Sequence, residues 1–386
     1  MLRRSLRFKE SHAIHHTVRH RRPGHVRGQR CECGTGRGGP RYFGDVQHHG
    51  PDHGARHGAG GIHARPRPSL HLPPGHRQRR RTAPIDRQLT IEGRDSTIVR
   101  DGLTAGAFRI FHVTSTGDLR LDDVTIRGDN APDAGGGILV DSSGNLKLDK
   151  VTLDNNQADI EGGGVFVVGG ATAYITRSES TFNNAGEGGG LQSDGTVTTD
   201  SVEFTHNNAG VGGAIGHEDG NAVFRNTTLK NNTSSLDGGG IDTESGPVQF
   251  INSKIIGNTT TGAQGGGIWN AVSLTLIKTE VSGNVAGGSN GQGGGIYDNP
   301  ADTLVLRDSS VDRNSANGSG TSQAGGIYNL SAAVTLDHSE VNNNASTVAP
   351  GGVWTDTQFT VNRSEIRRNI PTNCAGSSAI VTGCVG

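Results

Sequence analysis

A run of three small residues followed by an aliphatic residue recurs along this chain at intervals of 24 to 31 residues. The run is most often Gly-Gly-Gly or Gly-Gly-Ala. Its third positions are Gly137, Gly164, Gly190, Ala214, Gly240, Gly267, Gly295, Gly326 and Gly352. Repeats of this length are typical of solenoids, in which a single repeat cannot bury its own apolar face and must stack on its neighbours.

A second repeated feature is an Asn three positions after an aliphatic or aromatic residue. The pairs are Leu153/Asn156, Phe204/Asn207, Leu229/Asn232, Ile255/Asn258, Val281/Asn284, Val311/Asn314, Val341/Asn344 and Ile366/Asn369. Asp129 takes this position once, and the spacing breaks at Phe182, which Asn183 and Asn184 follow at once. We expect each amide to bond to its copies in the repeats above and below, which satisfies buried polar atoms.

Short runs of alternating apolar and polar residues lie between these two features, as in Leu274 to Leu276 and Leu304 to Leu306. Such alternation indicates half-buried strands, and no part of the repeat region shows a sustained helical stripe. The sequence therefore predicts an all-β, right-handed parallel β-helix of about ten coils of roughly 27 residues, with three short strands in each coil.

Composition supports a thin solenoid and divides the chain. Only 31% of the 386 residues are hydrophobic and 62 are glycine, which suits a narrow core. Residues 1–83 contain 18 Lys and Arg but four Asp and Glu, a net charge of +14, whereas residues 84–386 carry −15. We therefore predict a basic segment at 1–83, the β-helix at 84–370 and a C-terminal cap at 371–386.

The basic segment allows three interpretations. It holds 12 of the 16 His, with many Arg, Gly and Pro and no periodicity. It is a disordered arm that binds nucleic acid or another polyanion, or a metal site built from His48, His49, His53 and His57. The third interpretation, which we favour, is a translation of the gene in a shifted reading frame; nucleic-acid binding is expected only if the segment is genuine.

Two cysteines, Cys374 and Cys384, flank the segment that follows the last repeat. We expect them to form a disulfide that closes the open end of the solenoid, where backbone groups are otherwise unpaired. A disulfide also favours an oxidising compartment. No apolar run reaches the roughly 18 residues that a membrane span needs.

The motifs resemble those of known proteins. The run Gly212-Gly213-Ala214-Ile215 and the pair Phe204/Asn207 are similar to the repeats of polymorphic outer membrane proteins. The form Gly293-Gly294-Gly295-Ile296 resembles that of secreted β-helix proteins of the pectate-lyase-like superfamily. The resemblance covers residues 86–370 and implies export and a cell-surface or extracellular location, but no single chemistry.

The position after the aliphatic residue carries the first candidate site, because side chains alternate along a strand and this one should point outward. It is aromatic in four consecutive coils: Trp269, Tyr297, Tyr328 and Trp354. In earlier coils it is Leu139, Phe166, Gln192, Gly216 and Asp242. The aromatic line predicts either an exposed platform for sugar rings or a stack that stabilises the sheet.

The alternative is an enzyme. Resemblance to β-helix lyases implies Asp side chains that hold Ca²⁺ and an Arg or Lys base, and the acids that could gather on one face are Asp194, Asp219, Asp242 and Asp298. No basic residue accompanies them. His217, Glu218 and Asp219 form the one compact acid/base group of the repeats. No zinc spacing or calcium repeat is present, so no metal or other cofactor is predicted outside the lyase alternative.

We therefore expect a monomeric, extracellular or cell-surface β-helix that acts as an interaction protein and binds glycans along the aromatic line. A polysaccharide lyase or glycoside hydrolase is the second interpretation.

Overall fold

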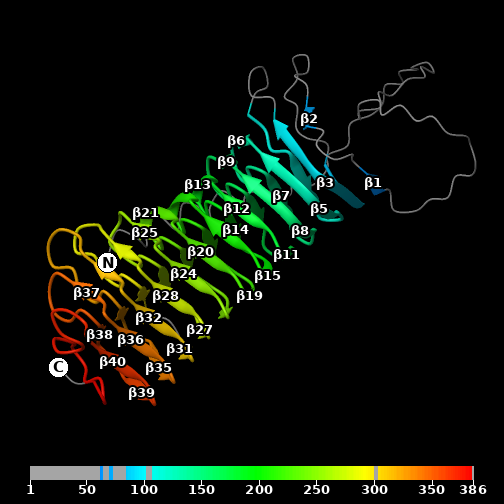
Figure 1. The fold of residues 1–386 in the computed structure, drawn as a ribbon. Coiled ribbons are helices and arrows are strands. Elements are labelled where there is room, and N and C mark those ends of the chain that lie inside the picture. The colour runs from blue at the N-terminus through cyan, green and yellow to red at the C-terminus, as the bar shows by residue number, and fades with distance from the viewer. Residues whose placement is uncertain (1–60, 64–68, 73–83, 101–106, 300–302, 385–386) are drawn as a thin grey trace, which may run out of the picture. The chain divides into compact units, whose positions relative to one another are not determined.

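The chain folds into a parallel β-solenoid in which successive coils stack in sequence order, with β3 near one end and β39 and β40 at the other (Figure 1). The computed structural model describes residues 61–63, 69–72, 84–100, 107–299 and 303–384. Three parallel sheets, A, B and C, contain all of its strands. Each coil contributes one strand to sheet B, so the ten strands of sheet B correspond to ten coils, as predicted.

Sheet A has two arms. Three strands run through both arms: β3 (Gln88–Arg100), β5 (Asp118–Arg127) and β8 (Asn145–Asp154). The first arm also contains β1 (Gly61–His63), β11 (Thr172–Thr176), β15 (Thr196–Asp200), β19 (Ala222–Arg225), β23 (Val248–Ile251), β27 (Leu274–Ile277), β31 (Thr303–Arg307), β35 (Ala333–Asp337) and β39 (Phe359–Asn362). The second arm contains β2 (Ser69–Leu72), β12 (Glu179–Thr181), β16 (Glu203–Thr205), β20 (Thr228–Lys230), β24 (Lys254–Ile256), β28 (Glu280–Ser282), β32 (Ser310–Asp312), β36 (Glu340–Asn342) and β40 (Glu365–Arg367).

Sheets B and C complete each coil. Sheet B contains β4 (Phe111–Val113), β7 (Ile138–Val140), β10 (Val165–Val167), β14 (Leu191–Ser193), β18 (Ile215–His217), β22 (Ile241–Thr243), β26 (Ile268–Asn270), β30 (Ile296–Asp298), β34 (Ile327–Asn329) and β38 (Val353–Thr355). Sheet C contains β6 (Asn130–Ala131), β9 (Gln157–Ala158), β13 (Asn184–Glu187), β17 (Asn208–Val211), β21 (Thr233–Asp237), β25 (Thr259–Thr260), β29 (Val285–Ala286), β33 (Ser315–Ala316) and β37 (Ala345–Ser346).

A typical coil has four short strands rather than the predicted three, because the chain bends within sheet A. The bend falls at a residue in the left-handed region, such as Arg177 (φ 47°) or Asn226 (φ 48°). Apart from Gly, Asn and Asp tolerate this conformation best, so an Arg at the bend gives no sequence signal for a turn. The alternating pattern continues across the bend and conceals it.

The core is a continuous apolar column. The aliphatic residue after each glycine run, for example Ile241 or Ile268, is fully buried and faces the apolar residues of both arms of sheet A. Neighbouring strands pair in register from coil to coil, so each residue packs on its own copy. This stacking explains why the predicted periodicity is so regular.

The Asn side chains form the predicted ladder inside the solenoid. Asn258 is typical: its Oδ1 accepts from both nitrogens of Asn232, and its Nδ2 donates to Oδ1 of Asn284 at 3.0 Å. Nδ2 also donates to the carbonyl of Leu229 at 2.9 Å. Each amide therefore satisfies backbone groups of the turn that no strand pairs.

The glycine run lies directly against this ladder. A Cβ on Gly295 would lie 2.9 Å from Nδ2 of Asn314 and 2.8 Å from the carbonyl oxygen of Gly326. The first glycine of the run has positive φ, as in Gly293 (φ 62°). Both requirements favour glycine, and alanine is found in its place only at Ala214 and Ala324, so the two repeated sequence features are two sides of one contact.

The ladder also continues through two irregular coils, one at Asn183 and one at Asp129. Asn183, not Asn184, occupies the ladder position, and Ser180 takes the place of the usual aliphatic residue three positions before it. Phe182 lies outside on the surface. The spacing that the sequence analysis judged broken is therefore intact, with a serine where a large apolar residue was expected.

Asp129 fills the first ladder position, and its carboxylate has no hydrogen-bond partner among the described residues. Burial raises its pKa to about 9, and the Arg100 guanidinium opposes that rise. The folded protein therefore keeps this carboxyl protonated at neutral pH.

Most of the basic segment, including His48, His49, His53 and His57, lies outside the described residues. Its two described pieces, β1 and β2, pair in parallel with β3. The described residues contain no helix long and apolar enough to cross a membrane.

The C-terminal end has the predicted disulfide, Cys374–Cys384, with a sequence separation of 10. The loop it closes packs on the last coil: Val381 is buried and bridges to Phe359, and Cys374 belongs to the core. The apolar column is thus covered where the repeats stop.

Replacing Asn258 by Ala should lower the free energy of unfolding by about 3 kcal/mol, because the Leu229 carbonyl and the Asn232 backbone N–H lose their buried partners. The matched control is Asn208→Ala, since Asn208 donates to Asn184 in an exposed pair. Chemical denaturation should show a change below about 0.5 kcal/mol for the control. Equal losses for the two variants contradict a structural role for the buried ladder.

Native protein should leave Cys374 and Cys384 unmodified by a thiol reagent unless a reductant is added. Replacing both by Ser should lower the free energy of unfolding by about 2–3 kcal/mol, as expected for so short a loop. Peptide mass spectrometry assigns the labelled sites separately from Cys31 and Cys33. Full labelling of Cys374 and Cys384 without reductant shows that the disulfide does not form.

Candidate functional site

The outer face of sheet B carries the most varied side chains of the solenoid. The residue after each core aliphatic points outward here, in line with its copies: Gly216 pairs with Gln192 and Asp242, and Asp242 pairs with Trp269. One flank holds the residue before each glycine run, and the other holds the residue after each sheet B strand. We call these flanks the turn column and the strand-end column.

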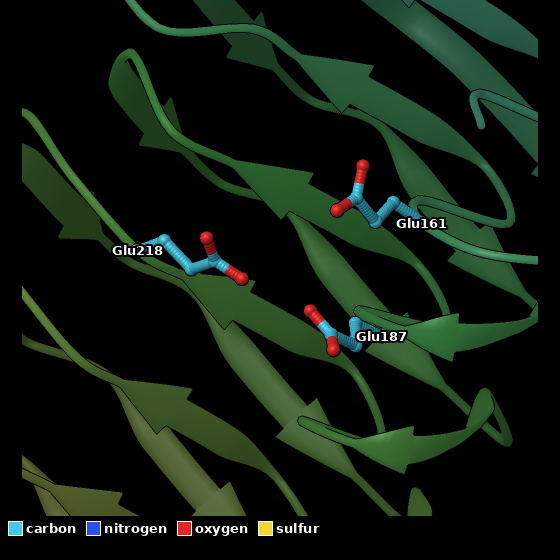
Figure 2. Close-up of side chains that lie close together, drawn as sticks. All are labelled: Glu161, Glu187 and Glu218. Carbon is cyan, nitrogen blue, oxygen red and sulfur yellow. The ribbon is translucent and has the colours of Figure 1, made fainter. Parts of the chain in front are cut away.

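Three glutamates converge on this face in the N-terminal half (Figure 2). Glu161 and Glu187 come from the turn column of consecutive coils and form a parallel bridge. Glu218 comes from the strand-end column, directly after β18. One carboxylate oxygen from each lies within 4.8 Å of the others. We call these three residues the glutamate cluster.

The carboxyl groups of the cluster resist ionisation. Burial raises the pKa of Glu161, Glu187 and Glu218 to about 7 each, and the neighbouring carboxylates add to the rise. Glu187 and Glu218 also share a hydrogen bond, which requires a proton on one of the two carboxyl groups. Asp194, one coil before Glu218 in the strand-end column, also has its pKa raised to about 7 by burial and by Glu161.

Gln192 lies beside the cluster. Its side chain is 1% exposed, its amide donates to Asp194, and its Oε1 has no hydrogen-bond partner. This oxygen occupies the place that a side chain at position 216 would need. A Cβ on Gly216 would lie 1.9 Å from Oε1 of Gln192 and 3.3 Å from the backbone nitrogen of Gly188. Because residue 216 is a glycine, the Gln192 side-chain carbonyl fits between Gly188, which follows Glu187, and β18, which precedes Glu218.

The predicted acid/base group does not come together. His217 points into the solenoid, is buried, and its ring nitrogens have no partner among the described residues; burial lowers its pKa. Asp219 is in a turn, where it accepts from Gly220. Only Glu218 joins the outer face. Alternation along β18 separates His217 from Glu218, although they are neighbours in sequence.

The four aspartates of the lyase alternative are also divided. Asp194 and Asp242 lie on the outer face, where Asp242 is buried between Gly216 and Trp269. Asp298 points inward and accepts from Nδ2 of Asn270 at 2.6 Å, and burial raises its pKa to about 7. Asp298 is therefore a core residue and not part of a surface site.

The aromatic residues form one continuous stack in the C-terminal half of the same face. Ring centroids are 6.5 Å apart for Trp269 and Tyr297, 5.4 Å for Tyr297 and Tyr328, and 4.3 Å for Tyr328 and Trp354, with interplanar angles of 18°, 10° and 7°. The predicted line of aromatic residues is present, and their flat faces contact one another.

The expectation that these rings are exposed is wrong for three of them. Trp269, Tyr297 and Tyr328 are 5%, 4% and 7% exposed, because Ala324 from the turn column side packs on the stack. The Trp269 indole donates to Oε1 of Gln264 at 3.3 Å. Ala271 and Leu330 also pack against the rings, which are therefore part of a second small core.

Trp354 differs because it ends the stack. It is half-buried, it stacks on Tyr328 on one side, and no described ring stacks on its other side. The following segment hydrogen-bonds to β38 through Asn373, Ser377 and Ala379. One indole remains partly open to solvent, held flat by the three rings below it.

Glu161 and Glu187 were not predicted as site residues, and Gln192 was predicted only as an outward position of the line. The signal that could have found the first two is their position immediately before the glycine run, where Asp237, Gln264, Gln292 and Gln323 also occur in later coils. Bridges from coil to coil join this column. Sequence alone gives no distance between this column and Glu218, which comes from the other flank of the sheet.

Comparison with known proteins supports the fold. Residues 109–286 match the family model described as "Right handed beta helix region". The match runs from the coil of β4 to β29 and therefore includes the glutamate cluster but only Trp269 of the aromatic stack. No curated protein and no solved structure matches the chain.

The glutamate cluster predicts a pH-dependent stability. Because the pKa values are raised from the ordinary 4.5 to about 7, the folded state holds more protons than the unfolded state between these values. The stabilising contribution is full below about pH 4.5 and is lost as the pH rises to about 7. In metal-free buffer, Glu187→Gln should raise the free energy of unfolding at pH 8 by about 1–2 kcal/mol, allowing for partial exposure, and change it little at pH 4.

The control is Glu203→Gln, since Glu203 is exposed on sheet A. Its free energy of unfolding should differ from that of the wild type by less than about 0.5 kcal/mol, as for most exposed positions. A Glu187→Gln difference that is the same at pH 4 and pH 8 contradicts the raised pKa values.

Proposed function

We propose that this right-handed β-helix is an extracellular binding protein without catalytic activity, and that it holds glycan chains at the C-terminal end of the outer face of sheet B. The observation that carries the proposal is the partly open Trp354 at the end of the aromatic stack. Indole rings bind the apolar faces of sugar rings, and a ring held in one orientation loses little entropy on binding.

An extracellular location is supported by the disulfide Cys374–Cys384, since disulfides persist in oxidising compartments. The surface of the solenoid is rich in Thr, Ser and Asn, and its side chains lie in regular rows one strand apart. A long polymer with a repeating structure is a suitable ligand for such rows.

The glutamate cluster favours a second candidate, a glycoside hydrolase, because two carboxyl groups with pKa values near 7 can exchange a proton at neutral pH. The geometry argues against it. Hydrolases keep their two carboxyl groups about 5 Å or more apart so that the sugar fits between them. Glu187 and Glu218 are instead hydrogen-bonded to each other.

A lyase is supported less. It needs a base near the carboxylates, and the charged groups that shift the pKa values of the cluster are all carboxylates. Binding without turnover is therefore the function we favour.

A polysaccharide panel tests the proposal, with retention and released products both recorded. The full-length protein should be retained on at least one glycan without cleaving it, and Trp354→Ala should reduce retention at least tenfold while the melting temperature changes little. Trp269→Ala should lower the melting temperature instead, because Trp269 is buried.

Tyr174→Ala is the matched control, since Tyr174 is an exposed aromatic residue on sheet A. Its retention should equal that of the wild type. Retention that survives in Trp354→Ala removes the proposed site, and cleaved or unsaturated products show that the protein is an enzyme.

A further inference from the structure

We propose that Glu161, Glu187, Glu218 and the side-chain carbonyl of Gln192 form a binding site for one divalent cation, with calcium preferred to magnesium. The site is separate from the glycan site at Trp354. It does not use the aspartates that the resemblance to lyases implied.

The distances between the carboxylates suit a shared ion. Calcium binds oxygen ligands at about 2.4 Å, so two oxygens on one ion can be at most about 4.8 Å apart. One carboxylate oxygen from each glutamate already lies within 4.8 Å of the other two. The three side chains extend toward a common space from three different coils (Figure 2).

Gln192 provides an independent observation. Its Oε1 is buried without a hydrogen-bond partner, which is costly for a carbonyl oxygen. It extends over Gly216 into the space between Gly188, which follows Glu187, and β18, which leads to Glu218. A cation bound by the glutamates supplies the partner that this oxygen lacks.

The surrounding charge favours a cation as well. Asp194 and Glu244 both act on Glu218, and both are carboxylates. A divalent cation is a suitable counterion for such a group of carboxylates.

The ligand set points to calcium. All four donors are oxygens, from carboxylates and an amide, which are the ligands of hard cations. They come from flexible side chains on three coils, and magnesium requires near-ideal octahedral geometry. Calcium accepts the irregular arrangement and completes its coordination with water.

Calcium titration of the full-length protein at pH 7.5, followed by calorimetry, tests the site. We expect one ion per chain with a Kd on the order of 10⁻⁴ to 10⁻³ M, as in extracellular calcium modules, and a rise in melting temperature. Glu187→Gln/Glu218→Gln should weaken binding at least tenfold. This isosteric variant removes repulsion, so it should remain folded and melt higher than the wild type in EDTA at pH 8.

Two further variants isolate the geometry. Gly216→Ala should weaken calcium binding severalfold with all three glutamates intact, because its Cβ displaces the Gln192 carbonyl. Glu179→Gln/Glu203→Gln is the matched control, since these stacked glutamates are exposed on sheet A, and it should bind calcium like the wild type.

The proposal is overturned if the wild type shows neither binding heat nor a higher melting temperature at about 10 mM calcium. It is also overturned if Glu187→Gln/Glu218→Gln keeps the wild-type affinity, or if Gly216→Ala binds as tightly as the wild type. Equal affinity for magnesium overturns the preference for calcium. None of these outcomes depends on whether a glycan binds.

Discussion

The structure depends on the need to satisfy polar groups inside a narrow core. Each coil turns between sheets A and C through a residue in the left-handed region, which leaves backbone groups that no strand can pair. The Asn ladder bonds those groups and bonds its own copies, so its members must repeat at the spacing of the strands. The glycine runs lie against the ladder, where a Cβ such as one on Gly295 would crowd the Asn side chain. Stacking of apolar side chains stabilises the solenoid, but the ladder makes the register of strand pairing specific.

This arrangement leaves the outward positions free to vary. On the outer face of sheet B, the same position is Gln192 in one coil, Gly216 in the next and Trp269 two coils later, with no change in strand pairing. Chemical groups placed in this way stand about 4.8 Å apart along the stack. The N-terminal half of the face has become acidic and the C-terminal half aromatic, so one sheet presents two kinds of site with the core unchanged.

The candidate sites were harder to predict than the fold, and particular residues show why. Trp269 and Tyr297 occupy the predicted outward line, yet they are buried, since Ala324 from a later coil packs with the stacked rings. Ser180 replaces a large apolar residue, and its coil was therefore misread although Asn183 keeps its place. His217 and Glu218 are adjacent in sequence, but alternation places His217 inside the solenoid and Glu218 on the outer face of sheet B.

The sequence by itself determined the architecture: the parallel solenoid, the number of coils, the core column, the Asn ladder and the C-terminal disulfide. It could do so because every coil packs on a copy of itself, and the period of the sequence is therefore the period of the structure. Only the tertiary structure decided which outward side chains meet. Glu161 and Glu187 come from one flank of the sheet and Glu218 from the other, 31 residues after Glu187. Their convergence depends on the width of the sheet, the path of the glycine turn and the missing side chain of Gly216, and none of these is a property of a single repeat.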